Sequence, residues 1–215
     1  MNVLVIAAHP DDEILGVGGT LLKHRKNGDN IFICIVTKGY EPEWSREYIE
    51  NKLSEAKEVD NLIGTKKRFY CNFPAARLNT IPQIEFNKKI KEVIEEVNPS
   101  VIYTHFEHDI HKDHNIIFNS VMVATRPIYE KKIRLICFET MSSSEWNNKR
   151  FNPNFYVDIT EFVDKKIDAF CKYISEVKEY PHPRSKKGIK IWDNKRGIEI
   201  CKEYAEAFII VRDFW

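Results

Sequence analysis

Two short stretches of this 215-residue chain combine imidazole and carboxylate side chains. One reads His-Pro-Asp-Asp-Glu at positions 9–13, and the other reads His-Lys-Asp-His at positions 111–114. Two histidines and one carboxylate are a ligand set that a catalytic zinc ion accepts while keeping one position open for water. A remaining aspartate could then act as a general base, and a remaining histidine could donate to a developing oxyanion. Together the two stretches are typical of metal-assisted hydrolysis.

Each stretch also has a structural explanation when it is taken alone. Acidic residues suit the first turn of a helix, so Pro-Asp-Asp-Glu is an ordinary helix start. The nearby His105 and His108 could be plain loop residues. Short motifs do not separate these alternatives by themselves. A catalytic role is favoured because both stretches follow the carboxyl end of a predicted strand.

The predicted strands are short apolar runs that alternate with segments of helical period. They cover residues 2–7, 30–37, 67–71, 101–105 and 133–138. This alternation predicts a mostly parallel sheet with helices on both faces, built as one Rossmann-like α/β domain over residues 1–215. In such a sheet ligands bind beyond the carboxyl ends of the strands. We therefore expect the two stretches to meet at one edge.

Three helices are predicted from apolar stripes. One has the stripe Phe86, Ile90, Val93, Ile94 and Val97 and is expected to open with a capping box at 80–83. The helix before it has the stripe Leu53, Ala56, Leu62 and Ile63 and ends at Gly64. Thr160 is expected to cap a helix with the stripe Val163, Ile167, Phe170, Ile174 and Val177. Another helix and an apolar ending over 207–211 follow a proline-rich loop at 180–184.

Composition excludes several classes of function. Lys plus Arg is 33 and Asp plus Glu is 32, so no global field draws the protein to nucleic acid or to an anionic membrane. No stretch approaches the ~20 apolar residues of a membrane span, and the N-terminus lacks the features of a signal peptide. Five cysteines without a CxxC pair predict reduced, buried thiols in a cytoplasmic protein.

The sequence resembles the PIG-L/LmbE-like family of zinc-dependent de-N-acetylases. The resemblance is carried by AHPDDE at positions 8–13 and HxDH at 111–114. It continues through Glu139 with Ser-Glu-Trp at 144–146, then through 152–159, 181–185, 196–197 and 204–208. Nearly the whole chain is covered, and the two metal motifs are specific in combination.

The resemblance implies a role for each residue of the two motifs. His9, Asp12 and His114 would bind one zinc ion per chain, with other divalent metals also accepted. Asp11 would be the general base, and His111 would stabilise the oxyanion. Asp113 would hold and orient His111, as carboxylates do behind catalytic histidines.

The implied reaction removes the acetyl group from an N-acetylamino sugar or its conjugate, releasing acetate and a free amine. The partner is then a small-molecule sugar, and relatives commonly assemble, so a homo-oligomer is an option. Arg77, Trp146 and Arg184 are candidate substrate-binding residues. Each has an alternative role in packing or ion pairing that the sequence leaves open.

Two departures from the family pattern bear on the substrate. Many relatives carry Asp-Gly after the third strand, where this chain has Ala-Ala-Arg at 75–77, which we interpret as a difference in substrate. The arginine often found early in the second helix has no clear equivalent, since Arg46 and Lys52 are both candidates.

Two other functions remain as alternatives. The first is a non-catalytic module that binds a sugar or a nucleotide sugar, although the complete set of motif residues argues against it. The second is a nucleotide-binding oxidoreductase. Its GxGxxG loop is missing after the first strand, and the Gly-Val-Gly-Gly stretch at 16–19 lies inside a helical segment, where close helix packing explains it.

Overall fold

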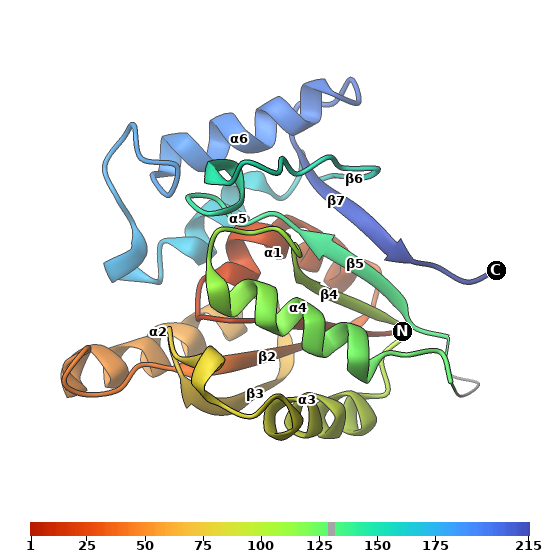
Figure 1. Cartoon of the computed structure of the whole chain (residues 1–215). Helices are drawn as coiled ribbons and strands as arrows, with labels where there is room; N and C mark the ends of the chain where they lie inside the picture. The colour runs from red at the N-terminus through yellow and green to blue at the C-terminus, as the bar shows by residue number, and fades with distance from the viewer. Residues whose placement is uncertain (129–131) are drawn as a thin grey trace.

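A computed structural model describes residues 1–128 and 132–215, and it contains one seven-stranded sheet (Figure 1). The strands are β1 (Asn2–Ala7), β2 (Asn30–Lys38), β3 (Thr65–Pro74), β4 (Val101–His105), β5 (Arg134–Phe138), β6 (Phe155–Asp158) and β7 (Ala205–Arg212). Their order is β3-β2-β1-β4-β5-β7-β6. The first five are parallel, and β7 runs antiparallel to β5 and β6. The predicted mostly parallel sheet is confirmed.

Helices cover both faces of the sheet, as predicted. They are α1 (Asp12–Lys26), α2 (Arg46–Ile63), α3 (Gln83–Val97), α4 (Lys112–Ala124), α5 (Val163–Phe170) and α6 (Lys186–Ile198). Short 3₁₀ helices lie at Leu78–Thr80, Ser144–Trp146 and Ile174–Glu176. One apolar core packs α1, α2, α5 and α6 on one face, and a second packs α3 and α4 on the other. Both faces of the central strands are therefore buried, which explains their continuous apolar sequences.

The strand order reverses between β1 and β4, and this reversal decides where a ligand can bind. The chain leaves β1 toward β2 on one side and reaches β4 on the other. The loops that follow β1 and β4 therefore part from each other and leave a crevice at the carboxyl ends of these strands. The two histidine and aspartate stretches occupy these two loops.

Glycines in α1 allow the helix to pack closely, as the sequence suggested. A Cβ atom added at Gly16 would lie 2.2 Å from the ring of Phe138, and one added at Gly19 would lie 2.8 Å from Ile159. Both contacts are far shorter than van der Waals distance, so a larger residue would push α1 away from β5 and β6. Since α1 begins at Asp12, these glycines also help to place the site.

Three details of the helix predictions are wrong. Helix α3 begins after Pro82 without a side-chain cap, because the Thr80 hydroxyl bonds to the Arg77 carbonyl. In α2 the stripe includes Lys52 and Val59, while Leu53 and Leu62 are exposed. The helix predicted after Thr160 ends at Phe170, and Thr160 does not cap it. Ile174 is exposed, because the chain turns into a 3₁₀ helix there.

The other predictions about helices and cysteines are confirmed in part. The α3 stripe is buried, and Gly64 ends α2 with a left-handed backbone (φ 79°). All five cysteines are free thiols, but only Cys34 and Cys137 are fully buried and Cys201 is exposed. No helix among the described residues has the length and apolar character needed to cross a membrane.

Candidate active site

The turn after β1 holds the first stretch in a strained conformation. Asp11 has φ 137° and ψ −35°, which is unusual for a residue with a side chain and costs of the order of 1–3 kcal/mol. The Asp11 N–H donates to the Glu13 carboxylate at 2.9 Å, and the Asp11 carbonyl accepts from the N–H groups of Ile14 and Leu15. The turn thereby points two consecutive aspartates in different directions. Such strain is typical of functional sites.

Glu13, the last residue of the motif, anchors the turn. Its buried carboxylate accepts a hydrogen bond from the Tyr173 hydroxyl at 2.6 Å and forms an ion pair with Arg68 at 2.9 Å. Arg68 is itself held by Asp60 on α2. Three separate elements therefore fix the N-terminal end of α1.

His9, Asp12 and His114 come together as the sequence predicts. One ligand atom from each lies within 4.8 Å of the other two. The Asp12 Oδ2 atom is 3.2 Å from His9 Nδ1 and 3.4 Å from His114 Nε2. Asp12 and His114 are fully buried, whereas His9 is partly exposed.

The donor set fits a divalent metal ion. Within the described residues, Asp12 Oδ1 and both ring nitrogens of His114 are buried and have no hydrogen-bond partner. Buried polar atoms of this kind require an explanation, and a bound ion is one. Burial by itself would lower the pKa of His9, but the carboxylates of Asp113 and Asp12 raise it to about 10. Two imidazoles with one carboxylate suit zinc.

A carboxylate lies behind each of the two histidines of the candidate metal site. Asp113 Oδ2 is 3.3 Å from His9 Nε2, and Asp109 Oδ1 is 3.2 Å from His114 Nδ1. Such pairs place the proton on the far nitrogen and leave the near nitrogen free to bind metal. Asp113 is fixed by the N–H of Ala76 at 2.7 Å.

Asp109 is a residue of the site that the sequence analysis missed. It accepts hydrogen bonds from the hydroxyl groups of Ser143 and Ser144 and from the N–H of His111. Burial opposes ionisation of Asp109, but hydrogen bonding to His114 and the two serines holds its pKa well below the usual range. Its position two residues before His111 was a usable signal, but the two serines come from a distant loop.

His105 supports the site from the end of β4. Its Nε2 atom accepts a hydrogen bond from the Ala8 N–H at 2.8 Å, and its ring stacks on His114 with centroids 3.8 Å apart. Burial lowers the pKa of His105 well below its usual value, so the ring is a neutral acceptor. His105 therefore ties β1 to β4 at the crevice.

His111 lies next to the metal ligands at the start of α4. Its Nδ1 atom accepts the N–H of Asp113 at 3.2 Å, which leaves the proton of the neutral ring on Nε2. Burial, together with His114 and His9, lowers the pKa of His111 to about 4. The Asp113 carboxylate bonds to His9 and to the N–H of Ala76, and it is the backbone N–H of Asp113 that bonds to the His111 ring.

Asp11 forms an ion pair with Arg184. The Asp11 Oδ2 atom is 2.8 Å from the Arg184 guanidinium, which also lies 3.1 Å from Glu176. Lys52 is 2.9 Å from Glu176. Negative and positive side chains therefore alternate from Asp11 to Lys52 on α2. Burial raises the pKa of Asp11 to about 7 against the opposing effect of Arg184.

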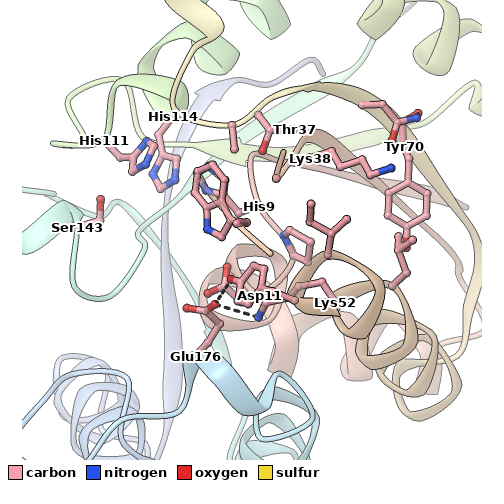
Figure 2. A pocket seen from close by; sticks show the side chains of 18 of the residues that line it. His9, Asp11, Thr37, Lys38, Lys52, Tyr70, His111, His114, Ser143 and Glu176 are labelled. Carbon is pink, nitrogen blue, oxygen red and sulfur yellow. Dashed lines mark hydrogen bonds and ion pairs between the residues drawn. The ribbon is translucent and has the colours of Figure 1, made fainter. Parts of the chain in front are cut away.

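One cavity of about 270 Å³ is lined by several of these groups, namely His9, Asp11, Lys52, His111, His114, Glu176 and Arg184 (Figure 2). His111 and His114 lie on one side, Asp11, Lys52 and Glu176 gather below His9, and Lys38 and Tyr70 lie on the far side. Of the three candidate substrate-binding residues, Arg184 lines the cavity. Arg77 and Trp146 are exposed and are not among its lining residues. Arg77 stacks on Tyr40, and Trp146 contacts His182.

Comparison with known proteins links this geometry to a family. The model of the PIG-L family, described as GlcNAc-PI de-N-acetylase, matches residues 4–125. A probable N-acetyl-alpha-D-glucosaminyl L-malate deacetylase 2 from Bacillus anthracis is 25% identical over 184 residues, which cover 81% of each chain. The diacetylchitobiose deacetylase of Thermococcus kodakarensis is 25% identical over 194 residues, covering 83% of this chain and 71% of the relative.

A solved structure agrees over the whole chain. The conserved protein TT1542 from Thermus thermophilus superimposes with a TM-score of 0.81 at 26% identity, covering 99% of this chain and 96% of that one. The family model spans more than half of the chain and contains both histidine and aspartate stretches. This chain therefore belongs to the PIG-L family, together with its LmbE-like deacetylase relatives.

Proposed function

We propose that this chain hydrolyses the acetamide of an N-acetylglucosamine-type sugar or its conjugate, releasing acetate and a free amine. The proposal depends on one divalent metal ion, zinc by its ligand set, held by His9, Asp12 and His114. The observation that carries it is the convergence of ligand atoms from these three residues, two of which, His9 and His114, line one cavity together with Asp11 and His111.

A divalent ion at these ligands would polarise the acetamide carbonyl and lower the pKa of water toward ~7. Asp11 takes the proton of the attacking water and later delivers it to the nitrogen of the leaving amine. The ion pair with Arg184 keeps the Asp11 carboxylate in one orientation. Because Asp11 and Asp12 diverge at the strained turn, one can act on water while the other stays on the metal.

His111 donates a hydrogen bond from Nε2 to the oxyanion of the tetrahedral intermediate. This assignment follows from its Nδ1 atom, which is already occupied by the Asp113 N–H. A neutral donor at this place stabilises the charge that develops in the transition state more than it stabilises the substrate. Asp113 and Asp109 position the metal-binding histidines from behind.

The relatives support the class of substrate. Deacetylases named for N-acetylglucosaminyl malate and for diacetylchitobiose each match about four fifths of this chain. Both names describe a 2-acetamido sugar joined to a further group. The precise sugar, the use of zinc in the cell, the cytoplasmic location and any homo-oligomer stay predictions.

The direct test is acetate release from a panel of N-acetylated sugars, free, glycosidic and nucleotide-linked, by protein loaded with zinc. We expect turnover of at least one glycoside, and loss of turnover after removal of the metal with a chelator. Asp11→Asn serves as the matched inactive control, because it should retain the metal. A sugar-binding module would bind panel members, and parent and variant would release no acetate.

A further inference from the structure

The end of the cavity farthest from the metal ligands is built by β2, β3 and the start of α2. Lys38 is the last residue of β2, and Tyr70 and Asn72 lie on the neighbouring β3. Asn72 has φ 59°, where the register between the two strands shifts. In Figure 2 the side chains of Lys38 and Tyr70 lie beside each other, away from His111 and His114. All three residues line the cavity.

The charges in the cavity are paired except at this end. Asp11 and Glu176 are matched by Arg184 and Lys52 through contacts of 2.8–3.1 Å. Within residues 1–128 and 132–215, no ion pair or hydrogen bond involves the Lys38 ammonium or the Tyr70 hydroxyl. The Asn72 amide makes only one long contact, 3.5 Å from the Tyr70 carbonyl. Among these residues Lys38 therefore leaves the cavity with one unpaired positive charge.

The cavity lining also includes aromatic and apolar side chains from the start of α2 and from the residues just before it. They are Trp44, Tyr48, Ile49 and Leu53. Trp44 packs against Gly39, since a Cβ atom added there would lie 3.3 Å from the indole. Aromatic side chains suit the C–H face of a sugar ring. A sugar bound with its acetamide at His9 would occupy the same cavity that Lys38 lines, so Lys38 is available to the substituent of that sugar.

We propose that Lys38, Tyr70 and Asn72 form a subsite for an anionic group, a carboxylate or a phosphate, carried by the part of the substrate that leaves with the amine. The inference rests on the proposed deacetylation and narrows its substrate to anionic conjugates. Lys38 supplies the charge, and Tyr70 and Asn72 supply neutral hydrogen-bond donors. Arg184, the earlier candidate for this task, is occupied by Asp11 and Glu176.

The test compares three N-acetylglucosaminides that share one acetamide: the neutral methyl glycoside, a glycoside with a carboxylate on its aglycone and one with a phosphate. We expect the zinc-loaded parent to favour one or both anionic compounds. In Lys38→Met the KM of the preferred anionic compound should rise about tenfold at nearly constant kcat, while the methyl glycoside is unaffected. Lys38→Arg should keep the KM of the preferred anionic compound close to its value in the parent.

Two further variants sharpen the result. Tyr70→Phe should raise the same KM by a smaller factor, because it removes one neutral donor. Lys66→Met, on β3 but outside the cavity lining, is the matched control and should change nothing. Which anionic compound responds to Lys38→Met separates a carboxylate from a phosphate.

Two results would overturn the subsite. One is equal kcat/KM for neutral and anionic glycosides in the parent, and the other is a Lys38→Met effect that is the same for all three. Calorimetric binding of the corresponding free-amine glucosaminides to the zinc-loaded protein gives the same comparison without turnover. If no compound releases acetate, the deacetylation proposal fails. Charge-dependent binding lost in Lys38→Met would still support the subsite.

Discussion

The two ends of the cavity are built in opposite ways. At the end with the proposed metal ligands Asp12 and His114 are fully buried, and a carboxylate lies 3.2–3.3 Å from the far nitrogen of His9 and of His114. At the other end Lys38 is exposed, and no group among the described residues pairs with its charge. A reaction needs fixed ligands and a fixed base, so the protein itself satisfies those groups. A site that recognises a substrate leaves its charged and hydrogen-bonding groups unpaired, so that the substrate can pair with them.

Among the variants that test this contrast, replacement of a proposed metal ligand should have the largest effect on metal content and activity. We expect His114→Ala to lose its metal, because only two protein ligands remain and the site is buried. Metal content measured after dialysis should fall from about one ion per chain to nearly none, and activity should disappear. His108→Ala, in the preceding loop but outside the cavity lining, is the control. Full metal occupancy in His114→Ala would refute the ligand assignment.

The next effect separates the two neighbouring aspartates. Asp11→Asn should keep the metal and lose about 10²–10⁴ in kcat, because a general base acts only in the reaction. Asp12→Asn should lose the metal itself. Metal analysis together with steady-state rates distinguishes the two variants. The division of roles fails if both lose metal to the same extent.

His111 tests the donor to the oxyanion. His111→Ala should lower kcat by on the order of 10²-fold or more, with metal content and KM little changed. The physical reason is that its Nε2 proton is offered to a charge present only in the transition state. A change confined to KM would instead place His111 in substrate binding.

Asp109 tests the support behind the metal end. Asp109→Asn should weaken metal binding by about 10–100-fold, because the His114 ring loses the charge that orients it. A metal-buffer titration measures this affinity directly. Asp164→Asn, at an exposed position of α5, provides the matched control. If metal affinity were unchanged in Asp109→Asn, the carboxylate would serve only to hold the two serine hydroxyls.

The smallest effect on kcat/KM is expected for Arg77 and Trp146, the two exposed candidates for substrate binding. Arg77→Ala and Trp146→Ala should each leave kcat/KM within about twofold of the parent, since surface changes away from a site are usually near neutral. Arg184→Ala should reduce kcat strongly by releasing Asp11. A large KM increase in Arg77→Ala would show that the substrate extends beyond the cavity lining.

Apolar periodicity predicted the sheet well because buried parallel strands leave a strong local signal. The strands at 2–7 and 101–105 have the observed bounds, and the one at 30–37 continues only to Lys38. Helix ends were predicted less well. Thr80 bonds to a turn carbonyl and does not cap α3, because the local chain offers it a competing acceptor. Such choices depend on contacts that a periodicity does not contain.

The two motifs together predicted metal-assisted hydrolysis, because two imidazoles and a carboxylate are typical of a catalytic zinc site. Tertiary structure decided which groups support them. Asp109 is held by the hydroxyl groups of Ser143 and Ser144 from a distant loop, and Arg184 reaches Asp11 from the other end of the chain. The place of Lys38 in the cavity is likewise a property of the fold. The sequence shows which charges exist, but pairing depends on distance, and distance is set by the fold.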